Sequence, residues 1–296
     1  MDYEQLYRAV QDYTENYEST FLENIPVFVK EAEKRIYNSV QIPALKKNAT
    51  LTASSQYVNL PDDWLSNHYV AAILPSGAYE FLLNKDTSFL RSSYPNPSTT
   101  GVPRYYTIFG PQTGDVNELR MMLAPTPNAT YSMDIQYFYY PPTIVQGEIT
   151  TLGTVSGGGG YTNGFYQNVL LSGGSGAYAR ADITVAGNAV TQVVLRSGGN
   201  FYRVGDSLTA SASTIGSAGA GFSVPVTALS NAEGTSWLGD NYDPVLLYGA
   251  LREAILFMKG EQDMVTYYEA KYQEGIAQLT RLGGILENTD TYRGNA

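Results

Sequence analysis

The chain has 296 residues, of which 43% are hydrophobic and 16% charged, with no cysteine and a formal net charge of −10. This composition fits one large domain or two ordinary ones, and it excludes disulfides and thiolate chemistry. The acidic balance argues against a broad phosphate-binding surface, which needs clustered Lys and Arg. No apolar run approaches the roughly 20 residues of a membrane span, and the first residues lack the apolar segment of a signal peptide. We therefore expect neither membrane insertion nor secretion.

Apolar residues at helical spacing predict two helices in the first forty residues. One stripe covers residues 3–17, and a stronger one covers residues 21–40. Spacings of three and four place such residues on one helix face, so both helices need a partner surface. The second helix could start at Thr20, as part of a capping box, or at Asn24, and Pro43 is expected to end it.

The end of the chain, residues 237–284, predicts two further helices joined by a tight turn. The Asp-Pro pair at 243–244 is a helix start signal, Gly260 interrupts the apolar pattern, and the glycine pair at 283–284 is a candidate C-cap. A helical hairpin of this size cannot bury both of its apolar stripes alone. We therefore expect the N- and C-terminal helices to pack together as a four-helix layer.

From about residue 50 the pattern changes to short apolar runs separated by Pro, Gly and Asn, which is typical of antiparallel strands. Residues 61–65 are expected to form a turn that leads into a helical turn. The expected strands lie at 50–52, 57–60, 69–74, 79–82, 105–109, 118–123 and 133–140, and a short helix is expected at 86–91.

Residues 152–230 hold over half of the 29 glycines of the chain and very few charged residues. The segment repeats itself at an offset of about forty residues, because 157–164 echoes 198–205 and 174–185 echoes 216–226. A flexible Gly/Ser linker is one interpretation of this composition. Alternating Val, Ile and Leu residues favour a compact β module instead, since a linker would not carry strand faces to bury.

The sequence thus predicts an α+β protein with a four-helix layer, an antiparallel β domain and an inserted all-β Gly-rich module. The helices and the β domain form a parent domain, residues 1–150 and 232–284. The Gly-rich module is residues 151–231. Residues 285–296 lose helical periodicity and are expected to form a C-terminal tail that cannot bury enough apolar surface to become ordered alone.

Catalysis has little support in the sequence. His68 is the only histidine, so there is no multi-histidine metal cluster, and we expect it at the surface or half-buried. The carboxylates of Asp62 and Asp63 could hold a metal, but a helix N-cap is the commoner use of such residues after a proline. The glycines at 157–160 lack the Gly-Lys-Ser/Thr ending of a phosphate-binding loop. We therefore assign no catalytic, cofactor-binding or metal-binding residue.

Eight short motifs occur in a fixed order along the chain. They are IPVFV at 25–29, EAEKRIY at 31–37, LPDDW at 60–64, GVPRYY at 101–106, LAPTP at 123–127, YFYYPP at 137–142, WL at 237–238 and LLYGAL at 246–251. Each motif is weak alone, but their order and spacing together resemble the head-to-tail adaptor (connector) proteins of tailed bacteriophages, especially those of short-tailed phages. The resemblance covers roughly residues 20–145 and 232–285.

The resemblance implies a homo-oligomeric ring, typically a dodecamer, between the portal protein and the tail nozzle or tail tube protein, with tail fibres as further candidate partners. It implies a structural protein of the virion, located at the head-tail junction after assembly in the host cytoplasm, and not an enzyme. DNA would pass through the lumen during ejection without specific binding. The resemblance also implies that the C-terminal tail docks on the portal, with Tyr292 as the anchor and Arg293 as its charged partner.

Two other classes of function stay open. A tail-fibre or glycan-binding virion module would use aromatic platforms on the Gly-rich module. A cell-wall hydrolase would need an acid/base pair, and none stands out. The candidate surface residues of the Gly-rich module are Tyr161, Phe165, Tyr166, Phe201 and Tyr202.

Overall fold

The computed structural model describes residues 1–110, 119–216 and 219–287. The chain divides into two compact units. Unit 1 consists of Met1–Val40 and Pro142–Ile285, and unit 2 is built on Gln41–Pro141. The division therefore falls at residues 40–41 and 141–142, whereas the sequence suggested boundaries at 150–151 and 231–232. Independent folding of the Gly-rich module stays a prediction.

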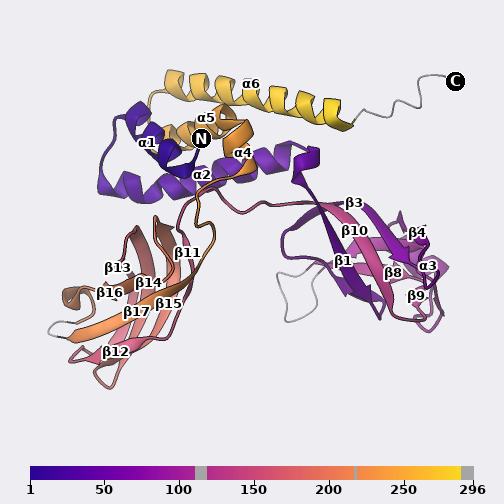
Figure 1. Ribbon diagram of the computed structural model, residues 1–296, viewed down its shortest axis with the longest axis horizontal. Helices are drawn as coiled ribbons and strands as arrows, with labels where there is room; N and C mark the ends of the chain where they lie inside the picture. Colours follow the sequence, from indigo (N-terminus) through magenta and orange to yellow (C-terminus); the bar gives the residue numbers. More distant parts are fainter. Residues whose placement is uncertain (111–118, 217–218, 288–296) are drawn as a thin grey trace. The chain divides into compact units, whose positions relative to one another are not determined.

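Unit 1 combines a layer of helices with a β-sheet (Figure 1). The α+β class is confirmed. The described residues form six α-helices. The short α4 joins the four expected helices of the layer in unit 1, so a layer of four helices is not confirmed, and α3 in unit 2 is the separate short helix. The helices of unit 1 are α1 Tyr3–Thr14, α2 Ser19–Ser39, α4 Trp237–Asn241, α5 Asp243–Phe257 and α6 Gln262–Glu287.

The first two helices start differently from what the sequence suggests. Asp2 and Gln5 form a capping box for α1. Helix α2 begins at Ser19 without a side-chain cap and continues through Pro26, so the expected starts at Thr20 and Asn24 are both wrong. It also ends at Ser39, before Pro43. Burial of the apolar stripe, which begins one turn before the proline, outweighs the cost of about 3 kcal/mol for proline inside a helix.

Two glycines let the helices of the layer approach closely. A Cβ atom on Gly249 of α5 would lie 3.0 Å from the Cβ of Ala32 on α2 and 3.4 Å from the ring of Tyr272 on α6. A Cβ on Gly275 of α6 would lie only 2.4 Å from Cγ2 of Val245 on α5. Both positions therefore exclude larger side chains, and they fix the contacts of α5 with its neighbours.

Ion pairs complete the packing of the layer. Arg35 of α2 lies 2.8 Å from Glu253 of α5, and Arg252 pairs with Glu269 of α6.

Helix α6 continues through the glycine pair at 283–284 to Glu287, so the predicted C-cap is wrong. Each glycine costs a helix only about 1 kcal/mol, and the buried Leu279 one turn earlier keeps this part of the helix packed.

The Gly-rich segment forms a folded antiparallel sheet, which excludes the linker interpretation. Its strand order is β11-β17-β16-β13-β14-β15, and β12 pairs with β17. Ile183, Val185 and Leu208 are buried in its core as expected, whereas Val204 is exposed. The strands are β11 Ile149–Leu152, β12 Ser156–Gly159, β13 Gly164–Ser172, β14 Ala177–Ala186, β15 Ala189–Asn200, β16 Ser207–Ala210 and β17 Ala220–Leu229.

The internal repeat is visible in the backbone of this sheet. Gly158 and Gly199, which are 41 residues apart, both have positive φ, at 62° and 60°. A Cβ on Gly158 would lie 2.2 Å from the carbonyl oxygen of Ala220, and a Cβ on Gly199 would lie 2.2 Å from that of Ala177. Both positions thus need glycine for the same two reasons, a left-handed backbone and a neighbouring strand in direct contact.

Unit 2 contains two four-stranded sheets, in the orders β1-β10-β3-β4 and β2-β8-β7-β5. The short pairs β5–β7 and β6–β9 are parallel, and the remaining pairs are antiparallel. The bounds are β1 Lys46–Ala53, β2 Tyr57–Asn59, β3 Trp64–Ile73, β4 Tyr79–Phe81, β5 Leu83–Asn84, α3 Thr87–Ser93, β6 Thr100–Gly101, β7 Tyr105–Phe109, β8 Arg120–Ala124, β9 Thr126–Pro127 and β10 Tyr131–Tyr139.

Most expected elements of unit 2 are present, with two differences. Asp86 caps α3 by accepting from the backbone N–H of Phe89 at 2.7 Å, which confirms the short helix. The helical turn expected at 61–65 is wrong, because β3 already begins at Trp64. Asp63 is not a helix cap. Its carboxylate accepts hydrogen bonds from the Tyr137 hydroxyl at 2.9 Å and from Lys47 Nζ at 2.6 Å. These bonds connect the start of β3 to β10 and β1.

Candidate interaction site

Two of the predicted aromatic surface residues are structural. Tyr161 and Tyr202 are only 3% and 2% exposed. The hydroxyl of Tyr161 accepts from the backbone N–H of Phe222 at 3.1 Å, and that of Tyr202 accepts from the N–H of Ala179 at 3.4 Å. The two tyrosines occupy equivalent places in the internal repeat. Their repetition in the sequence therefore reflects the core of the Gly-rich sheet and not a binding platform.

The other three aromatic residues lie in different environments. Phe201 packs against α1, with ring centroids 5.2 Å from Tyr3 and 5.4 Å from Tyr7. Phe165 is 58% exposed on β13, and Tyr166 is half-buried, with its hydroxyl bonded to the carbonyl of Thr162 at 2.9 Å. The structure thus does not gather the five residues into one site. Tyr292 and Arg293 lie outside the described residues.

The Gly-rich sheet is fixed to the helices by polar contacts. Arg180 of β14 pairs with Glu23 of α2, with one N–O distance of 2.9 Å, and Asn200 donates to the Tyr3 hydroxyl at 3.1 Å. Lys30 of α2 pairs with Glu148, just before β11. These contacts join charged and polar groups that are at least half-buried, so the sheet and the helices form one packed unit.

Glu33 is the buried carboxyl group of α2. Its Oε1 accepts from the backbone N–H of Ile144 at 2.8 Å, in the segment that follows β10. Burial raises the pKa of Glu33 to about 7, although hydrogen bonds from Thr143 and Ile144 and the charge of Lys30 oppose the rise. The group anchors this segment to the helical layer and titrates near neutral pH.

No described residues form a metal site. Within the described ranges, no group of three or more His, Asp or Glu side chains is arranged to hold a metal ion. His68 is exposed, as expected. The carboxylate of Asp63 is engaged with Tyr137 and Lys47, and these hydrogen bonds lower the pKa of Asp63 even though partial burial acts in the opposite direction.

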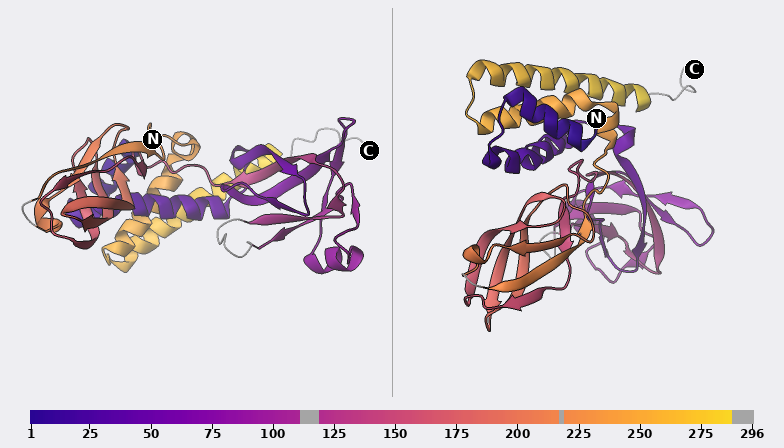
Figure 2. Two further views of the ribbon diagram at one scale, coloured as in Figure 1. Left: turned by 90° about the horizontal axis from the view of Figure 1, so that it is seen from below. Right: turned by 60° about the vertical axis from the view of Figure 1, so that its left-hand side comes forward.

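The α1–α2 and α5–α6 connections lie side by side at one end of the helical layer (Figures 1 and 2), and several large aromatic and apolar residues in or near these connections are exposed. Asn16 donates to the sulfur of Met258 at 3.3 Å across these two connections. The ring of Tyr267 packs edge-on against that of Tyr268, with centroids 5.4 Å apart. Burial raises the pKa of Tyr268, and the nearby Tyr267 and Tyr13 add to the rise. We call this end the aromatic corner; its exposed residues are Tyr13, Tyr17, Leu256, Phe257, Met264 and Tyr267.

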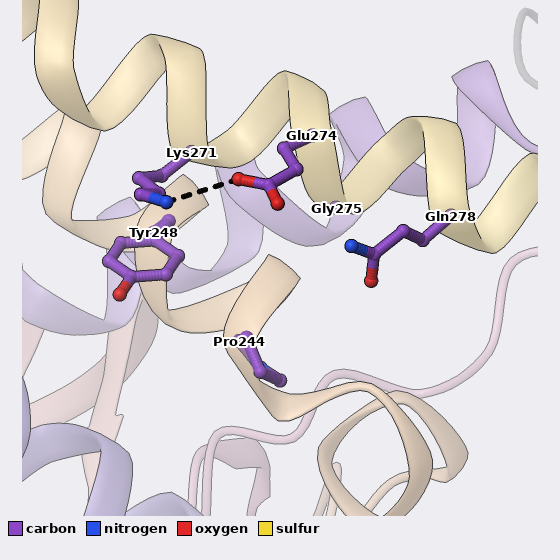
Figure 3. Close-up of a pocket in the computed structure, with 6 residues that line it drawn as sticks. All are labelled: Pro244, Tyr248, Lys271, Glu274, Gly275 and Gln278. Atoms are coloured by element: carbon purple, nitrogen blue, oxygen red, sulfur yellow. Dashed lines mark hydrogen bonds and ion pairs between the residues drawn. The ribbon is translucent and has the colours of Figure 1, made fainter.

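A groove of about 180 Å³ lies between α5 and α6 (Figure 3). Tyr248 stacks on Tyr268 behind it, with ring centroids 6.3 Å apart. At its edge, Lys271 Nζ lies 3.1 Å from Glu274 Oε2, and both side chains are largely solvent-accessible. The groove thus combines an aromatic wall with a charged rim; it is lined by Pro244, Tyr248, Lys271, Glu274, Gly275 and Gln278.

Unit 2 has an apolar row of its own. Tyr79 and Phe81 of the edge strand β4 and Leu83 of the edge strand β5 are all exposed. Tyr79 and Phe81 are two residues apart on β4 and share one side of that strand, whereas Leu83 lies on β5 in the other sheet. The ring of Tyr69 packs edge-on against Phe81, with centroids 5.7 Å apart. Such an edge is suited to a protein contact.

The comparison with known families agrees with a role in protein–protein contacts. A family model described as SU10 adaptor protein matches residues 1–169. The chain belongs to this family of phage adaptor proteins. The match includes α1, α2 and the described strands of unit 2, and it ends within β13. A search of curated proteins found no match.

Family membership confirms the resemblance seen in the sequence, and it identifies the chain as a structural phage adaptor. Sequence reasoning missed the aromatic corner. Tyr13, Tyr17 and Met264 occur at helical spacing and were assigned to the buried stripes, but the structure exposes all three. The available signal was their position: each lies beside a helix-helix connection, where a stripe no longer has a partner helix to cover it.

Proposed function

We propose that this adaptor forms a ring between the portal and the tail of a phage virion, and that the ring encloses part of the channel through which DNA is ejected. The family match over residues 1–169 is the observation that carries this proposal. The subunits would assemble in the host cytoplasm and remain at the head-tail junction. A dodecamer is the proposed copy number, and the tail nozzle or tail tube protein is the proposed partner below the ring.

The surface of unit 1 supports assembly. In a ring, each subunit touches one neighbour through one surface and the other neighbour through a second surface, because the contact is head-to-tail and repeats around the ring. The aromatic corner and the groove between α5 and α6 are adjoining surfaces of one subunit, linked by Tyr268, whose ring contacts Tyr267 of the corner and stacks on Tyr248 of the groove. The high tyrosine content, 25 residues against 10 phenylalanines, also suits contacts that stay partly hydrated.

The charge of the chain supports passage of DNA without specific binding. With a net charge of −10, a channel wall built from this chain repels phosphates more than it attracts them. Among the described residues, no helix is long and apolar enough to cross a bilayer. The proposed partners are proteins and DNA in transit.

A glycan-binding role for the Gly-rich module is the weaker proposal. It would rest on Phe165 and Tyr166 alone, because Tyr161 and Tyr202 are buried and Phe201 packs against α1. No catalytic role is proposed.

Co-sedimentation with the portal ring of the same phage tests the proposed function and the proposed tail contact together. The full chain should sediment with the portal. Truncation after Glu287 removes Tyr292 and Arg293 without shortening α6, and it should reduce binding if the tail docks on the portal. Unchanged binding of the truncated chain would mean that the portal contact lies on unit 1 or unit 2 and not on the tail. Failure of the full chain to bind would contradict the adaptor role.

A further inference from the structure

We propose that adjacent subunits meet by insertion of Tyr17 of one copy into the groove between α5 and α6 of the next copy. The inference rests on the proposed ring and names the two surfaces that close it. The observations that carry it are the shape of the α1–α2 connection, the size and lining of the groove, and the charges on both sides.

The α1–α2 connection presents Tyr17 as a rigid projection. Tyr17 is 64% exposed, the highest value among the large apolar side chains of the described residues. Glu15 ends α1 with a left-handed backbone (φ 49°), and the side chain of Asn16 bonds to the N–H of Glu18 at 3.0 Å and to Met258. A contact that is already ordered in the free subunit loses less conformational entropy on binding.

The groove is suited to one aromatic ring. Its volume of about 180 Å³ is comparable to cavities of about 150 Å³ that accept benzene. Tyr248 offers a ring face on one side, and Pro244 offers an apolar surface on another, as Figure 3 shows. Gln278 at the rim supplies a side-chain amide for the hydroxyl of an inserted tyrosine.

The charges around the projection and the groove are complementary. Asp12, Glu15 and Glu18 are exposed around Tyr17, and the carboxylate of Asp12 accepts a hydrogen bond from the Tyr17 hydroxyl at 3.2 Å, which insertion into the groove would replace. Lys271 lies at the groove, and Arg281 follows Gln278 by three residues on the same face of α6. The Lys271–Glu274 pair is 40% and 58% exposed, so it is weak and can rearrange around a partner's carboxylates.

The same charges disfavour a symmetric contact between two α1–α2 connections. If two copies met through these connections, six carboxylates would face each other, and Lys259 of the adjacent α5–α6 connection would be the one exposed cation in either connection of each copy. A contact between the corner and a different surface of the neighbour avoids this repulsion. A head-to-tail contact of this kind generates a ring when its rotation closes.

Cysteine cross-linking tests the pairing directly, because the chain has no cysteine of its own. The variant Glu18→Cys/Gln278→Cys keeps Tyr17 in place and, treated with a short bis-maleimide, should give a ladder of covalent oligomers. A mixture of the two single variants should stop at dimers, and each single variant alone should stay monomeric on a denaturing gel. Ser76→Cys/Gln278→Cys is the matched control, since Ser76 is exposed in a turn of unit 2.

Thermal melts should be unchanged, because both positions are exposed. Dimers from Glu18→Cys alone would show a symmetric contact and overturn the inference. A ladder no stronger than that of the control pair would also overturn it. Electron micrographs of the wild-type protein with its portal separate the two claims: a ring without the cross-links refutes only the named surfaces, whereas the absence of a ring refutes the proposed function.

Discussion

At the scale of single residues, Glu33 links the stability of unit 1 to pH. Its carboxyl group is buried on α2, and burial raises its pKa from 4.5 to about 7. The folded chain therefore binds this proton more tightly than the unfolded chain. Between about pH 4.5 and pH 7 the folded state carries more protons, so the contribution of Glu33 to stability falls as the pH rises through this window.

The variant Glu33→Gln should remove this pH dependence. A glutamine keeps an oxygen for the N–H of Ile144 but cannot ionise, so its free energy of unfolding should vary less between pH 5 and pH 8 than that of the wild type. The expected difference is on the order of 3 kcal/mol, from about 1.4 kcal/mol per pKa unit. Urea titrations at several pH values measure it. Glu31→Gln, at an exposed position of the same helix, should behave like the wild type; equal slopes for all three proteins would refute this assignment.

Gly158 tests the repeat in the Gly-rich sheet. In Gly158→Ala the new Cβ would lie 2.2 Å from the carbonyl oxygen of Ala220, and the backbone would keep an unfavourable φ of 62°. We expect a loss of more than about 2 kcal/mol in unfolding free energy. Gly159→Ala is the matched control, because a Cβ there meets no atom within 4 Å. Equal melting temperatures for the two variants would contradict the close strand contact.

At the scale of elements, α5 is the centre of the helical layer. Leu251 on this helix is fully buried, whereas Leu256 is 44% exposed. Leu251→Asp places an unpaired charge in the core and should destabilise the protein by about 3 kcal/mol or more. Leu256→Asp should change the stability of the monomer by less than about 1 kcal/mol. Circular dichroism melts compare them, and similar losses would show that α5 is not packed as described.

Sequence periodicity identified the helices well, because buried stripes follow the geometry of the helix itself. Helix ends were harder to predict. Local signals at Thr20, Asn24 and Pro26 favour a later start for α2 than the observed start at Ser19. Burial of Phe21 outweighs these signals. The glycine pair at 283–284 likewise fails to end α6, since a helix packed along one face tolerates such residues.

The candidate surfaces were less predictable for a physical reason. Exposure of Tyr17 and burial of Tyr161 depend on which neighbours reach them, and these neighbours are distant in the sequence. Phe222, for example, supplies the N–H that fixes the hydroxyl of Tyr161 from 61 residues away. Residue type alone does not distinguish a tyrosine of the core from one of a surface.

At the scale of the whole molecule, the Gly-rich module is proposed to be a separable insertion. Its first and last strands, β11 and β17, pair with each other, and the N–H of Ser230 bonds to the carbonyl of Glu148 at 2.9 Å. The two ends of the segment 151–231 are therefore adjacent, and a short Gly/Ser linker can bridge them.

Replacing residues 151–231 with such a linker should leave a protein that melts cooperatively but at a lower temperature. The loss follows because Tyr3, Tyr7 and Glu23 would lose their contacts with Phe201 and Arg180. Differential scanning calorimetry tests this expectation. A broad transition without cooperativity would show that the helices need the module to fold.

The central claim is that this chain assembles as a ring between portal and tail, and cryo-electron microscopy of the purified protein mixed with its own portal tests it most directly. The proposed function predicts class averages with a closed ring of adaptor density on the axis of the portal, with one adaptor per repeating unit. Portal particles without added density, or with single subunits bound off the axis, would contradict the claim.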